Sequence, residues 1–381
     1  MLHRQGAGVG GGPTKLVRAN TAAGPAHARL VLCTAILCAA MTCCLSVVQT
    51  LGQSSEQNSG KSGAAFERGI VAFRAGNYSA SAAQFAQAEA ASPGSTDALV
   101  YEAKSLVHLQ DFAAAEKALR RYLVSGHDSP DALYMLGFVL NRQNRPAESL
   151  ESYTQAAALA PPTGDDLKIV GLNYVLLDDY PDAFKWLEKA VEFDAKNKDA
   201  WYYLGRAYYT KARLAEARKA FLAVLNLDPR EVRAENNLGL IFESDAKPAD
   251  AMKAFQNAIV WQEHTPHPSE QPYVNLGNLL IEDGRAKDAI DPLEKAAKLA
   301  PGNAYCRLRL GTAYMRTGDL DKAQRELEEA TLLDPESAVA HYQLGRLYKQ
   351  IHSMDRAKAE FERTAELETR SASSAKTTPS Q

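Results

Sequence analysis

Histidines, cysteines and carboxylates are the residues of this sequence best suited to chemistry, and one cluster of them could be built into a metal site. His264 and His267 are three residues apart, with Glu263 beside them. Three prolines between residues 266 and 272 predict an extended loop, in which this spacing does not bring both imidazoles together. We therefore expect no metal here, and interpret the segment as a rigid elbow.

The motifs of common enzyme classes are missing from the sequence. It has no HExxH, GxSxG or CxxC pattern and no complete phosphate loop. The sequence therefore predicts no catalytic residues, no cofactor and no enzymatic activity. The net charge of -3, from 43 Lys and Arg against 46 Asp and Glu, also argues against a nucleic-acid partner.

Four of the five cysteines lie in one apolar run near the N-terminus. Residues 30–48 contain Cys at 33, 38, 43 and 44 and no charged residue, a length that can just cross a bilayer as a helix. Basic residues precede the run, and the first acidic residue is Glu56, so the positive-inside rule keeps the N-terminus in the cytoplasm. We expect residues 1–52 to be an export signal, and the rest of the chain to be periplasmic or otherwise outside the cytoplasm.

Two outcomes of this signal stay open. Thr50 and Gly52 are small residues at the -3 and -1 positions of a cleavage site before Gln53, which favours a removed signal peptide. The length of the apolar run favours an uncleaved anchor at residues 30–48, which would be the only contact with a membrane. In both cases Cys306 is the single exported cysteine, so the exported part has no intrachain disulfide.

The remaining sequence repeats with a period of 34 residues. Repeats begin at residues 62, 96, 130, 164, 198, 232, 270, 304 and 338, and the step from 232 to 270 contains four extra residues. Within a repeat, the apolar residues at positions 4, 7 and 11, and again at 20, 24 and 27, form one face of each of two helices. Gly or Ala at position 8 leaves room for the two helices to cross closely.

Turn and stop signals separate these helices. Glycines at 76, 284 and 318 lie between the two helices of a repeat, and prolines at 93, 161, 229, 301 and 335 end second helices. We expect an all-α array over residues 62–371, preceded by a polar linker at 53–61 and followed by a disordered tail at 372–381.

The repeat that starts at Lys198 shows the pattern most fully. It contains Trp201, Leu204, Gly205, Tyr208, Ala217, Phe221 and Pro229. This pattern resembles that of the tetratricopeptide repeat family. The resemblance implies a right-handed α-solenoid of about nine helix-turn-helix repeats, which binds a peptide or partner protein in a concave groove lined by the first helices.

The family pattern also implies which side chains face the groove. They include Tyr134, Phe138, Asn141, Tyr202, Arg206, Tyr209, Asn236, Asn275, Asn278, Arg309, Tyr342 and Arg346. Tyrosine and arginine supply contact area with polar tips, and asparagine can pair with an extended peptide backbone. The family's carboxylate clamp is not matched, because only Asn275 and Arg309 agree among its five positions.

We therefore expect a non-catalytic scaffold for a peptide or protein outside the cytoplasm, in a role such as envelope assembly or trafficking. Two alternatives stay open. One is an accessory subunit that positions substrates for a separate enzyme, such as a transferase. The other is a homo-oligomeric scaffold that packs through its groove.

Overall fold

The computed structural model describes residues 61–93, 96–126 and 128–377, and every regular element in these ranges is an α-helix. The predicted export signal at 1–52, nearly all of the linker at 53–61, and residues 378–381 lie outside the described residues. None of the described helices combines the length and the apolar character needed to span a membrane.

The chain divides into two compact parts after Gln110. In the N-terminal part, residues 61–74 are helical and are followed by α2 (Tyr78–Ala91) and α3 (Thr96–His108). Phe85 of α2 is completely buried against small residues such as Ala65 and Ala98. The boundary falls inside the repeat predicted from residue 96, between its two helices, so each part is described by itself.

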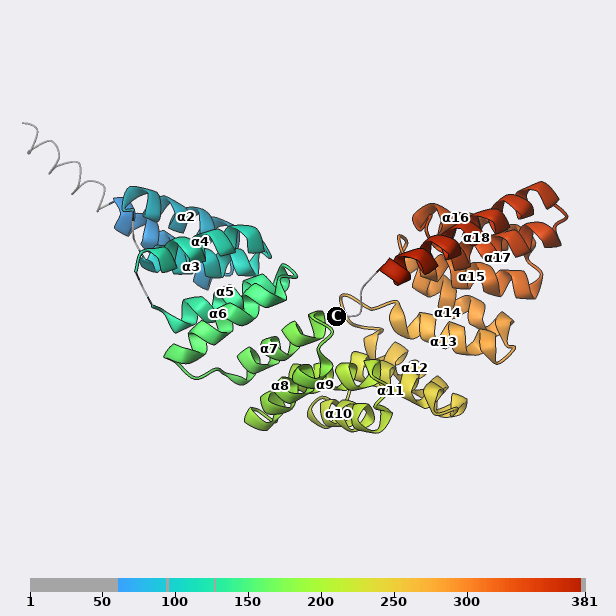
Figure 1. Cartoon of the computed structure of the whole chain (residues 1–381), viewed down its shortest axis with the longest axis horizontal. Coiled ribbons are helices and arrows are strands. Elements are labelled where there is room, and N and C mark those ends of the chain that lie inside the picture. Colours follow the sequence, from blue (N-terminus) through green and yellow to red (C-terminus); the bar gives the residue numbers. More distant parts are fainter. Residues whose placement is uncertain (1–60, 94–95, 127, 378–381) are drawn as a thin grey trace, which may run out of the picture. The chain divides into compact units, whose positions relative to one another are not determined.

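The C-terminal part consists of successive helix pairs, which Figure 1 colours from teal through green and yellow to red. Its helices are α4 (Phe112–Val124), α5 (Pro130–Arg142), α6 (Pro146–Leu159), α7 (Gly164–Leu176), α8 (Tyr180–Phe193), α9 (Lys198–Thr210), α10 (Leu214–Leu227), α11 (Val232–Ser244), α12 (Pro248–Gln262), α13 (Gln271–Glu282), α14 (Ala286–Leu299), α15 (Ala304–Thr317), α16 (Leu320–Leu333), α17 (Ala338–Gln350) and α18 (Met354–Thr377). From α5 onward, each first helix packs on the second helix of its own repeat and on that of the preceding repeat. This is the α-solenoid architecture that the sequence predicts.

Helix boundaries follow the 34-residue period closely. α9 begins at Lys198 and α15 at Ala304, each at a predicted repeat start, whereas α13 begins one residue late, at Gln271. Each of the five prolines expected to end second helices lies two residues beyond the last residue of its helix, as Pro229 does after Leu227. Proline is well suited to this place because it cannot continue a helix and sets the next turn.

Close helix crossing depends on the glycine at position 8. A Cβ atom added to Gly205 would lie 2.8 Å from Phe221 Cε1, and one added to Gly239 would lie 2.4 Å from Phe255 Cε1. Phe221 and Phe255 are both completely buried. The predicted role of this position is therefore confirmed: the missing side chain leaves the space that a large, fully buried residue of the second helix fills.

The turn inside each repeat uses the left-handed region of backbone conformation. Gly284 and Gly318 have φ of 78° and 88°, as the turn prediction requires. Ala212 and Ala246 occupy the corresponding turns with φ of 56° and 55°. A residue with a Cβ atom pays a steric penalty there, so these two turns are held in place by the packing of the helices that they join.

Several neighbouring repeats are joined by a hydrogen bond from a tyrosine to a glutamate. The tyrosine lies at position 11 of one repeat and the glutamate at position 25 of the repeat before it. The pairs are Tyr208 with Glu188, Tyr314 with Glu294, and Tyr348 with Glu328 at 2.7 Å. Burial and the glutamate together raise the tyrosine pKa, to about 12 for Tyr348.

The two junctions that flank the repeat starting at 232 have other residues at these positions. Between the repeats that start at 198 and 232, Phe242 takes the place of the tyrosine and Leu222 that of the glutamate. Between the repeats at 232 and 270, Leu280 and Gln256 occupy them. These two junctions therefore depend on other contacts.

Two sequence predictions need correction. α18 continues to Thr377, so residues 372–377 are helical rather than part of a disordered tail. Ala, Ser, Lys and Thr continue the helix there because no glycine or proline interrupts the chain before Pro379. Pro272 lies in the first turn of α13, where a proline is tolerated, so the inserted loop is confined to residues 263–270.

Candidate binding groove

A cavity in the described C-terminal part is lined mainly by first helices. It has a volume of about 790 Å³ and takes residues from α9, α11 and α13, from the turn after α9, from the first residue of α10, and from the inserted loop. The lining consists of Tyr202, Arg206, Tyr209, Thr210, Ala212, Leu214, Val232, Arg233, Asn236, Asn237, Leu240, Ser244, Ser269, Gln271 and Pro272. First helices were expected to line the groove, and three of them contribute to this cavity.

Four of the predicted groove residues line this cavity together. Tyr202 is 7% exposed, Tyr209 is half-buried, and Arg206 is exposed. Asn236 of α11 is buried, and its Oδ1 accepts a hydrogen bond of 2.9 Å from Nδ2 of Asn275 on α13. The two asparagines thus join two neighbouring first helices at the cavity and hold the Asn236 amide in one orientation.

The next two predicted residues form a separate group on α13 and α15. Asn278 Oδ1 accepts a hydrogen bond of 2.5 Å from Arg309 Nε, and its Nδ2 donates to the Tyr305 hydroxyl at 3.1 Å. The Arg309 guanidinium also lies 4.0 Å from the Glu282 carboxylate. Near this group, burial and then the Glu282 charge raise the pKa of Glu243.

The predicted residues of α5 form contacts within the fold instead. The Tyr134 hydroxyl donates to the Ala160 carbonyl at 2.6 Å, and Asn141 Nδ2 donates to Asn173 Oδ1 at 2.8 Å. Phe138 packs against a buried cluster of α6 and α7. These three side chains do not line the cavity, and their contacts fix the packing of α5.

The last two predicted residues are again a tyrosine and an arginine, at the same repeat positions as the pair on α9. Tyr342 and Arg346 on α17 have the same positions in their repeat as Tyr202 and Arg206 on α9. Tyr342 is 46% exposed, and the Arg346 guanidinium lies 6.0 Å from its ring centre. Identical residue types at identical positions thus line a cavity on α9 and lie at an open surface on α17.

The charge of the cavity is positive. Arg206 and Arg233 belong to the lining, and none of the described residues that line it is Asp or Glu. Arg233 is engaged by Glu231 and Asp199 and stacks 4.5 Å from the Tyr202 ring centre. Arg206 Nη1 makes only a long contact of 3.4 Å to the Tyr202 hydroxyl.

One important residue was missed by sequence reasoning. Gln262, at the end of α12, is 2% exposed and holds the inserted loop. Its Nε2 donates to the Ser269 carbonyl and its Oε1 accepts from the Ser269 amide, both at 2.8 Å. This double hydrogen bond positions the wall formed by Ser269 and Gln271. The available signal was an amide side chain directly before an inserted loop, whose backbone groups need partners.

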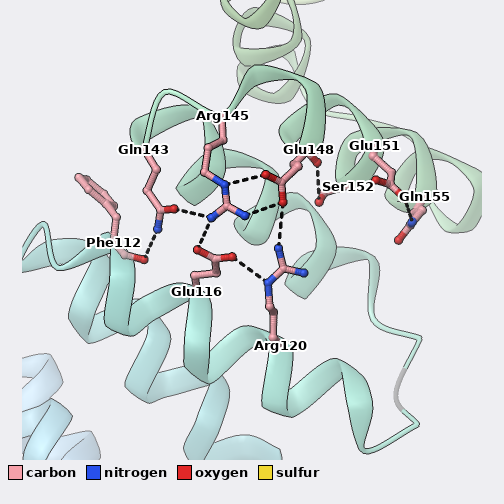
Figure 2. A network of polar contacts seen from close by, with 9 residues as sticks. All are labelled: Phe112, Glu116, Arg120, Gln143, Arg145, Glu148, Glu151, Ser152 and Gln155. Carbon is pink, nitrogen blue, oxygen red and sulfur yellow. Dashed lines mark hydrogen bonds and ion pairs between the residues drawn. The ribbon is translucent and has the colours of Figure 1, made fainter.

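A second polar cluster, between α4 and α6, is internally paired (Figure 2). Arg145 contacts Glu116 at 2.6 Å and Glu148 at 2.5 Å, and Arg120 contacts the same two glutamates at 2.8 and 3.4 Å. Burial raises the pKa of Glu116, but hydrogen bonds from Arg120 and Arg145 outweigh it and leave the pKa lowered. Each charge is already neutralised by a neighbour, so the cluster joins helices and is a poor candidate for a ligand site.

The inserted loop does not assemble a metal site. His264 and His267 are both exposed on it. Within residues 61–93, 96–126 and 128–377, no three His, Cys, Asp or Glu side chains gather in a way that could hold a metal ion.

Family models described as tetratricopeptide repeat match several segments of the chain. One matches residues 175–236 and 280–340, and another matches overlapping segments from 51 to 162. Together they cover more than half of the 381 residues.

Curated relatives match more distantly. The BBSome complex member BBS4 of Bos taurus is 24% identical over 223 residues, 57% of this chain and 42% of that protein. The cytochrome c-type biogenesis protein CycH of Pseudomonas aeruginosa is 30% identical over 124 residues, 32% of this chain and 30% of that protein. The chain thus spans less than half the length of either relative.

Solved structures support the fold. A tetratricopeptide repeat protein from Parabacteroides merdae matches with a TM-score of 0.53 and 18% identity, covering 66% of this chain and 98% of that one. The APC/C hetero-tetramer Cut9-Hcn1 matches with a TM-score of 0.51 and 16% identity, covering 72% of this chain and 53% of that one.

Proposed function

This chain belongs to the tetratricopeptide repeat family, and from that premise we propose that it is a scaffold that binds an extended segment of a partner protein in the cavity between α9, α11 and α13. Proteins built from these repeats generally act by binding and not by catalysis. The chain adds no catalytic motif of its own.

The cavity is the observation that carries this proposal. Its volume of about 790 Å³ is large enough for several side chains, and its lining combines two tyrosines with amides and two arginines. Oδ1 of Asn236 accepts a hydrogen bond from Asn275. The Nδ2 group of Asn236 is a donor, and it makes no hydrogen bond to the described residues. A peptide carbonyl is a suitable acceptor for it.

Photo-crosslinking in the native cell tests the proposal. A photoreactive amino acid at Thr210, which is exposed at the cavity, should crosslink to one continuous segment of a partner, mapped by mass spectrometry. Gln350 is the matched control, because it is exposed at the same position of the repeat on α17. Tyr202→Ala should abolish the crosslink at Thr210. Equal crosslinking at both positions, or crosslinks that survive Tyr202→Ala, would contradict binding in the cavity.

We propose further that the scaffold works outside the cytoplasm. The support is the uncharged run at residues 30–48 with basic residues before it. An envelope assembly or trafficking role would fit this location, and the similarity to a cytochrome c-type biogenesis protein favours it. Cell fractionation with N-terminal sequencing tests the location: a chain that begins at Gln53 indicates cleavage, a full-length chain in the membrane indicates an anchor, and recovery only from the cytosol contradicts export.

A further inference from the structure

We infer that the bound segment carries an acidic side chain that pairs with Arg206, a conclusion that rests on the proposed binding of an extended peptide in the cavity. The inference concerns the chemical class of the partner: an extended segment with Asp or Glu within its sequence. It is carried by the charge of the lining, by the availability of one arginine, and by the course of the cavity.

The charge of the lining contrasts with that of the chain. The whole sequence has a net charge of -3, yet the cavity contains two arginines and no carboxylate among its described lining residues. A concave site of one sign concentrates its field and attracts groups of the other sign. An acidic segment is thus favoured over a neutral or basic one.

Only one of these arginines is available to a ligand. Arg233 already contacts Glu231 at 2.9 Å and Asp199 at 3.1 Å and stacks on Tyr202. Arg206 forms no ion pair with any described residue, and the one hydrogen bond of its guanidinium to these residues, from Nη1 to the Tyr202 hydroxyl, is long at 3.4 Å. A guanidinium in this state can offer two parallel N–H groups to a carboxylate.

The course of the cavity favours a side chain over a chain terminus. The lining extends along α9 on both sides of Arg206, from Tyr202 to Thr210, and reaches across α11 to Pro272 on α13. An extended segment that fills this length passes Arg206 and does not end there. The carboxylate that reaches Arg206 is therefore assigned to an internal Asp or Glu.

Carboxylates on the first helices beyond α9 indicate where along the cavity the acidic side chain of the bound segment lies. Glu243 at the end of α11 and Glu282 at the end of α13 interact closely enough for the charge of Glu282 to raise the pKa of Glu243. Arg309 on α15 is the cation that faces both of them. An acidic side chain is repelled by this pair and attracted by Arg206, so the acidic position of the segment lies near α9.

Peptide selection tests the inference. A random-peptide display library is selected on the full chain, and enriched peptides are synthesised with amidated C-termini for fluorescence anisotropy. We expect enrichment of internal Asp or Glu. Replacing that acid by its amide should weaken binding about tenfold, and Arg206→Gln should cause the same loss. In the Arg206→Gln protein, the acid-to-amide change should then have no further effect. Arg346→Gln, at the same repeat position outside the cavity, is the control and should bind normally.

The outcomes separate the inference from the function on which it rests. If no peptide is enriched above beads without protein, the proposed peptide binding fails. If enriched peptides bind but tolerate the acid-to-amide change, or lose equal affinity with Arg346→Gln, peptide binding stands and the pairing with Arg206 is wrong. If amidation alone abolishes binding, the recognised carboxylate is a chain terminus, and the assignment to an internal side chain is overturned.

Discussion

The repeats around the cavity and the repeats that follow it are joined by different contacts. In the cavity segment, residues 198–282, ion pairs cross the first junction: Arg218 with Asp245, and Arg233 with Asp199. In the C-terminal segment, residues 286–377, tyrosines bond to glutamates of the preceding repeat: Tyr314 to Glu294 and Tyr348 to Glu328. Along the cavity segment, this junction thus has ion pairs between partly exposed charges, which salt and acid weaken, where the C-terminal segment has tyrosine–glutamate hydrogen bonds.

Truncation of the central side chain of a repeat should have the largest effect, and the same effect in both segments. Phe255 and Leu327 are completely buried and pack against the glycine of the opposite helix. We expect Phe255→Ala to lower the local free energy of unfolding by about 3–5 kcal/mol and Leu327→Ala by about 2–5 kcal/mol. Hydrogen exchange resolved by segment measures both. A much smaller loss for Phe255→Ala would mean that the two segments differ in their cores and not only in their junctions.

Loss of the hydrogen bond between Tyr314 and Glu294 should destabilise the C-terminal segment, in which both residues lie. Tyr314→Phe removes the hydroxyl that donates to Glu294 and leaves a half-buried carboxylate without this partner. We expect a loss of about 1.5–3 kcal/mol in urea unfolding followed by tyrosine and tryptophan fluorescence. Tyr209→Phe is the matched control in the cavity segment, and we expect a change below about 0.5 kcal/mol. Equal effects would show that the hydroxyl bond does not distinguish the two segments.

Acid should weaken the cavity segment through Glu231. Burial raises the pKa of Glu231, but Arg233 and Lys198 outweigh it and bring the pKa to about 2 from the usual 4.5. A lowered pKa gives stability that is present above 4.5 and is lost as the pH falls toward 2. We expect Glu231→Gln to remove this part of the pH dependence, measured as segment-resolved exchange between pH 5 and pH 2 with the intrinsic rates corrected.

Glu235 on α11, the helix that Glu231 caps, is the control, because its pKa is shifted in the opposite direction. Burial raises its pKa, although Asn257 donates a hydrogen bond of 2.8 Å to its carboxylate. A raised pKa gives stability that is present in acid and is lost as the pH rises through the folded-state value. Glu235→Gln should therefore increase stability at neutral pH relative to acid. Parallel pH profiles for the two variants would contradict both assignments.

The smallest expected effect comes from introducing a tyrosine–glutamate hydrogen bond at a junction of the cavity segment that lacks one. Leu222→Glu together with Phe242→Tyr reproduces the spacing of Tyr208 and Glu188 at the junction between the repeats at 198 and 232. We expect the double variant to gain about 1 kcal/mol in thermal or urea unfolding beyond the sum of the single changes. A purely additive result would indicate that Arg218, which lies 5.8 Å from the Phe242 ring centre, prevents the pair from forming.

The sequence predicts the repeats far better than the site. Gly205 and Phe221 belong to one 34-residue pattern, so their contact follows from helical periodicity within a single repeat. The bond between Asn236 and Asn275 joins different repeats across an insertion, and its length depends on how they stack. The hydrogen bonds between Gln262 and Ser269 depend on the conformation of the inserted loop, which the 34-residue repeat pattern does not predict.

The same distinction explains the groove residues. Position in the repeat groups Tyr202 with Arg206 and Tyr342 with Arg346. It cannot tell that the first pair lines a cavity, because that depends on the two first helices that follow α9. The end of α18 at Thr377 was missed for a related reason: helix propensity carried the chain past the last residue that the repeat pattern requires.

The burial of Cys306 makes its reaction with an alkylating reagent a measure of local unfolding in the C-terminal segment. This residue is completely buried in α15, and burial, together with the Glu270 charge, raises its thiol pKa to about 11. At neutral pH the sulfur is both shielded and protonated, so an alkylating reagent reacts with it only while the repeat is open. The alkylation rate of Cys306 therefore measures how often the segment opens in the protein without any substitution. A partner bound in the neighbouring cavity that stabilises the segment would lower this rate.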